Sequence, residues 1–295
     1  MPVTDPAVRI GGSPAVPRGD TASPGHRASF ARHVVLFTSG KGGVGKTLVA
    51  VNVANALAQR GLRVGLLDAD VHGPSVPRML QLAGERVRWN DADRMIPAEN
   101  FGLRVMSVGL TTPEADTPLG WRSAVATAAL VQMLDDVEWG PLDVLAIDLP
   151  PGTGDVALSL SQSAYVAGAI VVTSPQQVAV ADTRRAVAMY QKLNIPVLGL
   201  IENMSYFACP SCRHESDIFG RGGGERLAGE LQLPFLGSIP ISEPVRQGGD
   251  TGVPIMLSDP DSPAAEAFVK AAERTAAQVS IQSFRTPVIP LTPVN

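Results

Sequence analysis

A glycine-rich segment with two lysines constrains the fold of this chain more than any other feature. The segment reads Gly40-Lys41-Gly42-Gly43-Val44-Gly45-Lys46-Thr47. Residues 33–38 before it form a short β-rich run. Residues 46–59 after it carry apolar side chains at the spacing of one helix face, and Gly61 stops the pattern. A strand, a glycine loop and a helix in this order form the Walker A arrangement, which predicts a phosphate site.

The residue types of this loop suit a phosphate group. Glycines let the backbone curl so that its N–H groups turn inward, and the following helix adds its positive amino end. Lys46 is expected to reach the β- and γ-phosphates of a nucleotide, and the Thr47 hydroxyl to bind Mg²⁺. A flexible glycine-rich turn is the alternative, and it leaves the lysine, the threonine and both flanking elements unexplained.

Apolar strands and helices alternate along the rest of the chain. Strand candidates are residues 62–67, 103–108, 143–148, 169–173, 197–201 and 235–239, and helix candidates are residues 125–134, 177–193 and 264–279. Nearly continuous apolar strands that alternate with helices predict a parallel sheet covered on both faces. We therefore expect an α/β fold with a doubly wound, mostly parallel sheet and helices on both faces.

The chain is expected to form one large domain with an extension at each end. Residues 1–30 are rich in Pro, Gly, Ser and Arg without a hydrophobic period, which predicts a disordered arm. Residues 283–295 contain three prolines and are expected to form a tail. Residues 31–282 are expected to fold as the domain that carries the phosphate loop.

Composition and charge argue against several other classes of protein. Apolar residues make up 45% of the chain and charged residues 18%, an ordinary globular balance. The net charge of −4 disfavours a nucleic-acid partner held by bulk electrostatics. No apolar run is long enough to span a membrane, residues 264–279 do not resemble a membrane-targeting helix, and the first residues lack the apolar core of a secretory signal. We expect a cytoplasmic protein without a nucleic-acid or membrane partner.

Carboxylates follow two of the apolar strand candidates. Asp68 and Asp70 lie just beyond residues 62–67, and Asp148 ends residues 143–148. In an open α/β sheet, ligands lie outside the carboxyl ends of the strands. Asp148 is therefore expected to hold Mg²⁺ as a Walker B carboxylate, and Asp70 is placed to orient or activate a water molecule. The alternative for Asp68 and Asp70 is that they only begin a turn, as Asp often does.

Asn203 follows the strand candidate at residues 197–201. Its side-chain amide offers both a hydrogen-bond donor and an acceptor. This combination matches the edge of adenine, so Asn203 is a candidate for base recognition.

A C-x-x-C pair, Cys209 and Cys212, holds both cysteines of the chain and forms a second chemical centre. It suits a redox dithiol, half of a zinc site or half of an iron–sulfur site. Zinc or a [4Fe–4S] cluster normally needs four ligands, so a symmetric dimer would complete the set. His214 is a candidate third ligand for zinc, although a surface histidine is the simpler reading. A thioredoxin-like pair would follow the first strand, which this pair does not.

Lys41 is an extra lysine that the general Walker A pattern does not require, and a solvated surface role is the simpler reading. Its position resembles that of the first lysine in the deviant Walker A ATPases, the family of ParA, MinD and the nitrogenase iron protein. The resemblance implies that Lys41 crosses a dimer interface to the partner's nucleotide and that ATP favours a face-to-face homodimer. It also implies a catalytic role for Asp70 and a place beside the base for Asn203.

Five segments together are similar to the Mrp/ApbC branch of this family, the iron–sulfur cluster carriers. They are residues 39–47, 68–75, 148–155, 202–205 and 209–212, and the resemblance covers about residues 33–257. It implies a slow ATP hydrolase that uses Lys41, Lys46 and Asp70. It further implies a labile [4Fe–4S] cluster held by Cys209 and Cys212 of two subunits and passed to apo iron–sulfur proteins.

Two features depart from that family pattern. Members often carry a small extra α/β domain at the amino end, where this sequence has only the short arm. Trp121-Arg122 begins like a family Trp-Arg-Gly-Pro-Met segment but continues as Ser123-Ala124-Val125.

The glycine run at residues 220–224 lacks a preceding strand and a following Lys-Thr, so we interpret it as a loop.

Other functions remain open on the sequence alone. A positioning ATPase like MinD or ParA would carry a basic amphipathic tail or basic patches, which this sequence lacks. An electron-transfer ATPase like the nitrogenase iron protein takes its cluster cysteines from well-separated positions. An ATPase dimer that holds a structural zinc would have the same cysteine pair as a cluster carrier.

Overall fold

The computed structural model describes residues 31–71, 73–111, 123–152, 154–209, 211–212 and 214–285. The strands are β1 (Ala31–Ser39), β2 (Val64–Asp68), β3 (Arg88–Trp89), β4 (Met95–Ile96), β5 (Ala98–Asn100), β6 (Leu103–Ser107), β7 (Leu142–Asp148), β8 (Val166–Thr173), β9 (Val197–Glu202), β10 (Phe207–Ala208), β11 (Glu215–Ser216) and β12 (Phe235–Ser238). The helices are α1 (Lys46–Gln59), α2 (Val76–Met79), α3 (Ser123–Asp136), α4 (Gly154–Ser163), α5 (Gln177–Lys192), α6 (Gly223–Glu230), α7 (Glu243–Thr251), α8 (Ile255–Ser258) and α9 (Pro263–Arg285), with a 3-10 turn η1 (Val108–Leu110).

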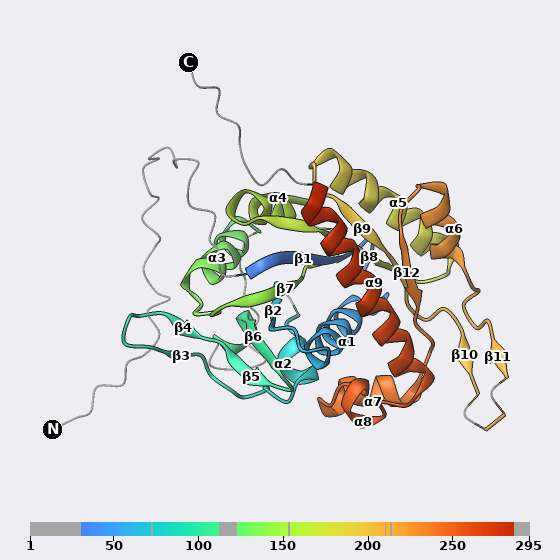
Figure 1. Cartoon of the computed structure of the whole chain (residues 1–295), viewed down its shortest axis with the longest axis horizontal. Helices are drawn as coiled ribbons and strands as arrows, with labels where there is room; N and C mark the ends of the chain where they lie inside the picture. Colours follow the sequence, from blue (N-terminus) through green and yellow to red (C-terminus); the bar gives the residue numbers. More distant parts are fainter. Residues whose placement is uncertain are drawn as a thin grey trace, which may run out of the picture.

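An eight-stranded sheet forms the centre of the molecule, in the order β12-β9-β8-β1-β7-β2-β6-β5 (Figure 1). All neighbouring strands in it pair in parallel except β5, which is antiparallel to β6. Two small antiparallel hairpins, β3–β4 and β10–β11, lie outside it. The predicted fold class, an α/β fold with a mostly parallel sheet, is confirmed.

Alternate side chains of the central strands enter two different hydrophobic cores. Val35 and Phe37 of β1 pack in the core that contains the buried faces of α1 and α9. Val34 and Leu36 pack in a second core with α3 and α4. Because successive strand residues point to opposite faces of a sheet, helices cover both faces. Figure 1 shows α9 lying across the sheet beside α1.

The strand order places a topological switch point between β1 and β7. The chain leaves β1 through α1 and reaches β2 on one side, whereas it leaves β7 through α4 and reaches β8 on the other side. Loops that diverge in this way open a crevice outside the carboxyl ends of the strands, where ligands bind in open α/β sheets. The phosphate loop follows β1 and Asp148 ends β7, so both lie at this crevice.

Two predicted boundaries differ from the structure. Helix α9 runs to Arg285, so residues 283–285 of the predicted tail are helical, and the Ser283 hydroxyl donates to the Val279 carbonyl at 2.8 Å. Helix α6 begins at Gly223, so the loop interpretation holds only for residues 220–222 of the glycine run. The three prolines that indicated a tail all lie beyond Arg285, and Gly223 and Gly224 are helical although glycine has a low helix propensity. The predicted arm, the Trp121-Arg122 segment and residues 286–295 lie outside the described residues.

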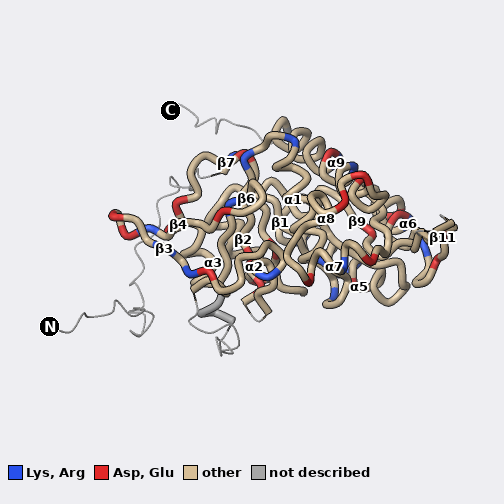
Figure 2. Tube along the Cα trace, turned by 90° about the horizontal axis from the view of Figure 1, so that it is seen from below, with Lys and Arg blue, Asp and Glu red and all other residues tan. Residues whose placement is uncertain are grey.

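Charged residues of both signs are interspersed over the described elements (Figure 2). The longest helix, α9, contains glutamate, lysine and arginine along its length. Within the described residues, no helix combines the length and the apolar character that a membrane span requires.

Candidate functional site

The phosphate loop leaves β1 and enters α1 through two glycines in the left-handed region. Gly43 has φ +83° and Gly45 has φ +78°, which only glycine adopts at little cost. The first turn of α1 contains no acidic residue. Its amino end therefore presents a positive field toward the loop, where a phosphate binds favourably.

Neighbouring backbone and side chains press closely on this loop. A Cβ atom at Gly40 would lie 2.3 Å from the backbone carbon of Asp182 in α5. A Cβ atom at Gly45 would lie 2.3 Å from the side-chain nitrogen of Asn203. The loop is thus wedged between α5 and the end of β9, and glycine at these two positions permits the close approach.

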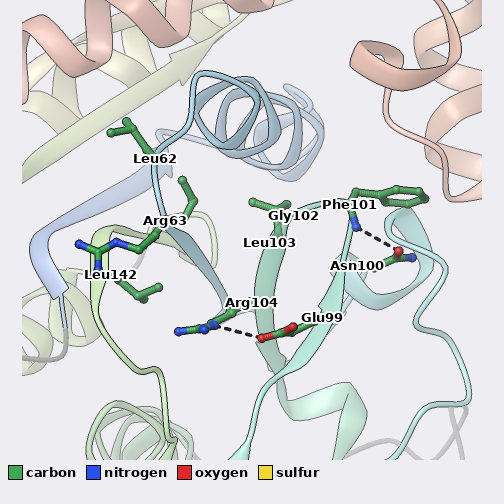
Figure 3. A pocket seen from close by; sticks show the side chains of 10 residues that line it. Leu62, Arg63, Glu99, Asn100, Phe101, Gly102, Leu103, Arg104 and Leu142 are labelled. Carbon is green, nitrogen blue, oxygen red and sulfur yellow. Dashed lines mark hydrogen bonds and ion pairs between the residues drawn. The ribbon is translucent and has the colours of Figure 1, made fainter.

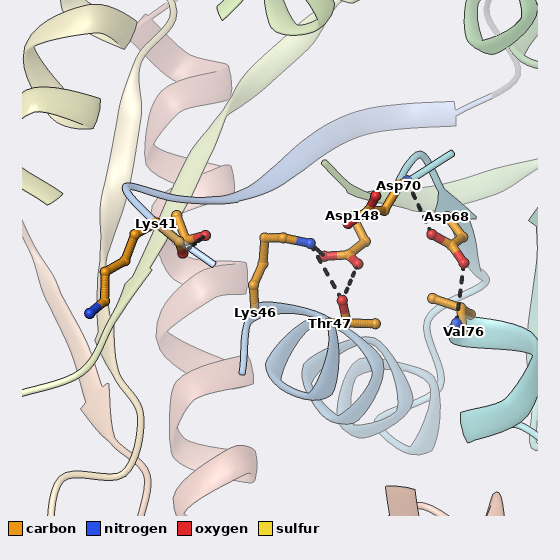
Figure 4. Close-up of polar contacts among 8 residues, drawn as sticks. Lys41, Lys46, Thr47, Asp68, Asp70, Val76 and Asp148 are labelled. Atoms are coloured by element: carbon orange, nitrogen blue, oxygen red, sulfur yellow. Dashed lines mark hydrogen bonds and ion pairs between the residues drawn. The ribbon is translucent and has the colours of Figure 1, made fainter. Parts of the chain in front are cut away.

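Lys46 and Asp148, which are buried, and Thr47, which is half-buried, form a polar group beneath the loop (Figure 4). The Lys46 ammonium lies 2.6 Å from one Asp148 oxygen, and the Thr47 hydroxyl donates to the other at 2.6 Å. Burial raises the pKa of Asp148, and the Lys46 ammonium opposes that rise. A hydroxyl and a carboxylate are the hard oxygen donors that Mg²⁺ prefers. These donors fit the predicted magnesium site, and Lys46 stands beside it.

Asp68 lies next to this polar group and is fully buried. Its carboxylate accepts hydrogen bonds from the Ser107 hydroxyl at 3.1 Å and from the backbone N–H groups of Val76 and Asp70 at 3.2 Å each. Burial, reinforced by the neighbouring Asp148 carboxylate, raises the pKa of Asp68 to about 7. The side chain therefore does more than begin a turn, because it ties the segment between β2 and α2 to β6.

Asp70 follows in the same segment and is only half-buried. Figure 4 shows it between Asp68 and Asp148, and its charge contributes to the raised pKa of Asp148. The structure thus brings Asp70 to the crevice where Lys46 and Thr47 lie, as the sequence predicts. Its suitability for orienting a water molecule there stays a prediction.

Lys41 is the predicted site residue that the structure separates from the others. Its side chain points away from Lys46 and Asp148 (Figure 4). Its backbone carbonyl accepts a 2.9 Å hydrogen bond from the Ser39 hydroxyl, which fixes the start of the loop. An ammonium group on this outward course is directed away from the phosphate position of its own chain.

Asn203 is buried against the phosphate loop. Its side-chain nitrogen donates to the Val44 carbonyl at 2.9 Å, and its backbone N–H donates to the Thr173 carbonyl at 2.8 Å. The first contact explains why Gly45 approaches it so closely. Asn203 therefore braces the loop in this structure, and its contact with adenine stays a prediction.

The two cysteines lie on a hairpin, which we call the cysteine hairpin and which comprises β10, β11 and the turn between them. The Cys209 N–H donates to the His214 carbonyl at 3.0 Å and closes the turn. Both thiols are free of disulfide bonds, with Cys209 half-buried and Cys212 exposed. Hydrogen bonds from the backbone N–H groups of Cys212 and Ser211 lower the pKa of Cys209. A lowered pKa favours the thiolate, which is the form that binds metal.

The cysteine hairpin projects beyond the β12 edge of the sheet (Figure 1). His214 is exposed beside it. Among the described residues, no group of three or more His, Cys, Asp or Glu side chains gathers closely enough to hold a metal ion. The structure thus shows two separate centres in one chain, the phosphate crevice and the paired thiols.

A pocket of about 480 Å³ lies near the amino ends of β2, β6 and β7, at the end of the strands opposite to the phosphate loop (Figure 3). Its two arginines already have acidic partners: Arg63 pairs with Asp143 at 2.8 Å, and Arg104 pairs with Glu99 at 3.1 Å. The pocket is therefore distinct from the phosphate crevice, and its cations are occupied by neighbouring carboxylates.

One buried carboxylate near the site, Glu202 at the end of β9, was not assigned a role from the sequence. It lies next to Asn203 and is completely buried. The signal that marks it is its position at a strand end, which also marks Asp68 and Asp148.

Comparison with known proteins agrees with this arrangement. The family model described as NUBPL iron-transfer P-loop NTPase, of the ParA group, matches residues 31–276. The chain belongs to this family. The resemblance to iron–sulfur cluster carriers that the sequence motifs indicate is thereby confirmed at the level of the family.

Individual relatives of this iron-transfer P-loop NTPase support the assignment. The iron-sulfur cluster carrier protein of Aquifex aeolicus is 50% identical over 242 residues, which cover 82% of this chain and 66% of the relative. A nucleotide-binding protein from Archaeoglobus fulgidus, solved in complex with ADP, is 34% identical with a TM-score of 0.69 over 82% of this chain and 94% of that one. The septum site-determining protein MinD from Pyrococcus horikoshii, solved with Mg-ADP, shares the fold with a TM-score of 0.63 and 24% identity over 85% of this chain and 98% of that one.

Proposed function

We propose that this P-loop NTPase hydrolyses ATP and carries a [4Fe–4S] cluster, held between two copies of the chain, to apo iron–sulfur proteins. One observation carries the proposal. A single folded chain combines a formed phosphate crevice with a separate hairpin whose two thiols are free and whose Cys209 has a lowered pKa. A positioning ATPase of the MinD or ParA kind has no need of the second centre.

The nucleotide-binding part of the proposal rests on the polar side chains beneath the phosphate loop. Thr47 and Asp148 would hold Mg²⁺, which would neutralise phosphate charge at the bound nucleotide. Lys46 lies 2.6 Å from Asp148 in the structure, so a bound nucleotide would offer its ammonium a second anionic partner. Asp70, half-buried at the same crevice, would orient the attacking water. Asn203, which already contacts the loop at Val44, would recognise adenine.

The dimer part rests on two incomplete sets of groups. The chain has two cysteines, whereas a [4Fe–4S] cluster normally takes four thiolates. Lys41 points away from the phosphate position of its own chain. A face-to-face homodimer with two-fold symmetry would complete both sets at once, since each chain would give the other what it lacks.

The cluster is the cargo in this proposal, and apo iron–sulfur proteins are its recipients. Free thiols of this kind persist where the environment is reducing, so we propose the cytoplasm as the compartment. Hydrolysis would be slow and coupled to release of the cluster, because both centres depend on the same pairing of subunits.

Anaerobic reconstitution with iron and sulfide tests the proposal. We expect brown protein with about one four-iron cluster per dimer, measured by absorption, iron analysis and molar mass. Cys209→Ala and Cys212→Ala should each abolish the colour. Ser211→Ala is the matched control, because it alters the same turn and leaves both thiols in place. A colourless dimer that retains stoichiometric zinc would contradict the carrier function and support a structural zinc.

A further inference from the structure

Glu202 is a buried carboxylate that binds three groups on the chain around the cysteine hairpin. Its Oε1 atom accepts the Ser205 hydroxyl at 2.5 Å and the Gly222 N–H at 2.8 Å. Its Oε2 atom accepts the Gly224 N–H at 2.5 Å. Removing one partner of a fully buried carboxylate is costly, so this arrangement, which we call the Glu202 clasp, is a firm contact.

The glycine run at residues 220–224 is shaped to receive this carboxylate. Gly222 has φ +73° and precedes α6, whose amino end favours a negative charge. A Cβ atom at Gly224 would lie 2.8 Å from Thr173 Cγ2 and 3.2 Å from Glu202 Cβ. The run therefore binds an anion, as glycine loops at helix starts do, but the anion belongs to the protein itself.

The clasp joins both ends of the cysteine hairpin. Ser205 lies two residues before β10, and Gly222 lies on the segment that leads from β11 into α6. Beside it, the Arg221 guanidinium lies 4.5 Å from the centre of the Tyr206 ring and 2.5 Å from Glu215. The two chain ends that lead into and out of the hairpin are thus held together at one carboxylate.

The same strand end also reaches the phosphate loop. Asn203, the next residue after Glu202, donates to the Val44 carbonyl of the loop at 2.9 Å. Glu202 instead turns to the glycine run. One peptide bond at the end of β9 therefore joins the residue that contacts the phosphate loop, Asn203, to the residue that holds the hairpin, Glu202.

We propose that Glu202 is the positioning residue through which nucleotide at the phosphate loop alters the cysteine hairpin. A nucleotide that shifts Asn203 against Val44 shifts the end of β9. The clasp passes that movement to Ser205 and to Gly222, because a buried carboxylate with three partners moves together with them. This inference rests on the proposed function, since it concerns the thiols that would hold the cluster.

The test measures how fast iodoacetamide alkylates Cys209 and Cys212 in full-length, cluster-free protein, with and without Mg-ATP. Peptide mass spectrometry separates the two cysteines. For each cysteine, the quantity of interest is the alkylation rate with Mg-ATP divided by the rate without it. A purely structural change would alter both of these rates together and leave their ratio unchanged. We expect a ratio that differs from one by about fivefold in the wild type, at the low end of the usual range for coupled sites.

Glu202→Gln should bring this ratio close to one, because an amide cannot accept from all three donors. Its Mg-ATP affinity should stay at the wild-type value, and amide exchange at Gly222 and Gly224 should accelerate. Glu225→Gln is the matched control, since Glu225 is an exposed acid in the first turn of the same helix. Ser205→Ala removes one partner of three and should give an intermediate ratio.

Gly224→Ala provides a second route that leaves Glu202 in place and keeps the test decisive if Glu202→Gln does not fold. Its new methyl group would crowd Thr173 and displace the clasp, so the ratio should fall here too. An unchanged ratio in folded Glu202→Gln, or in both Ser205→Ala and Gly224→Ala, would overturn the proposal, as would a wild-type ratio of one. A normal nucleotide response in protein that assembles no cluster would instead reject the carrier function alone.

Discussion

Asp68 and Asp148 end neighbouring parallel strands and are direct partners in the register of β2 and β7. Both side chains are buried, but only Asp148 has a cation against it, the Lys46 ammonium at 2.6 Å. Asp68 instead accepts hydrogen bonds from Ser107 and from two backbone N–H groups. When two adjacent buried carboxylates share one cation, the carboxylate without the cation binds a proton more readily. Here that carboxylate is Asp68.

Asp68→Asn should therefore reduce the pH dependence of stability. The pKa of Asp68 is about 7 in the folded protein, compared with 3.8 for an unperturbed aspartate such as that of the unfolded chain. Between pH 3.8 and pH 7 the folded state therefore binds more protons than the unfolded state. Its contribution to the free energy of unfolding is full at acidic pH and falls as pH rises from about 4 to about 7. In Asp68→Asn this fall should shrink by up to about 4 kcal/mol, as measured by urea unfolding across that range. The same change at exposed Asp91 should leave the profile as in the wild type, and an equal profile for Asp68→Asn would contradict the assignment.

Lys46→Met should abolish ATP hydrolysis and also destabilise the fold. It removes the cation that lies beside buried Asp148, and breaking a buried ion pair typically costs about 3–5 kcal/mol. The double variant Lys46→Met with Asp148→Asn should recover much of that stability while remaining inactive, because neither charge is then left alone. Urea unfolding and phosphate release measure the two effects. Cluster assembly on the cysteines should persist in the double variant, and loss of assembly there would show that the two centres are not separable.

Lys41 should act on the nucleotide of the partner subunit. Lys41→Ala should lower ATP hydrolysis by less than the roughly 10³–10⁵-fold effect of an arginine finger, because lysine lacks the bidentate fork. Mixing Lys41→Ala protein with Lys46→Ala protein should restore activity. In the mixed dimer, one site combines an intact Lys46 with an intact Lys41 from the other chain. If the mixture is no more active than the separate variants, Lys41 does not act in trans.

Asn203→Ala should reduce the preference for ATP over GTP. Loss of a hydrogen bond worth about 1 kcal/mol corresponds to roughly a fivefold change in affinity, which should appear for ATP and not for GTP. Competition binding with a fluorescent nucleotide measures both. An equal loss for the two nucleotides would mean that Asn203 acts only through its contact with Val44 on the loop.

The parts of the fold that local patterns specify were predicted closely from the sequence. Helix α1 runs over Lys46–Gln59 as its apolar spacing indicates, and the central strands lie within a few residues of the predicted apolar runs. Helices α6 and α7 were not predicted, because glycine and proline lower their intrinsic helix propensity. Tertiary packing overrides that propensity, since Leu227 and Val245 are buried in the folded chain.

The sequence by itself determined which residues are candidates for the chemistry, because a glycine loop, a strand-end carboxylate and a C-x-x-C pair are local patterns with local causes. Only the tertiary structure decided which of them meet. Lys46 contacts Asp148 because β7 lies beside β1, and Glu202 contacts Gly222 and Gly224 because the chain folds back on the end of β9. Such contacts join residues far apart along the chain. Strand order and burial set them, and neither can be read from the spacing of side chains within one segment.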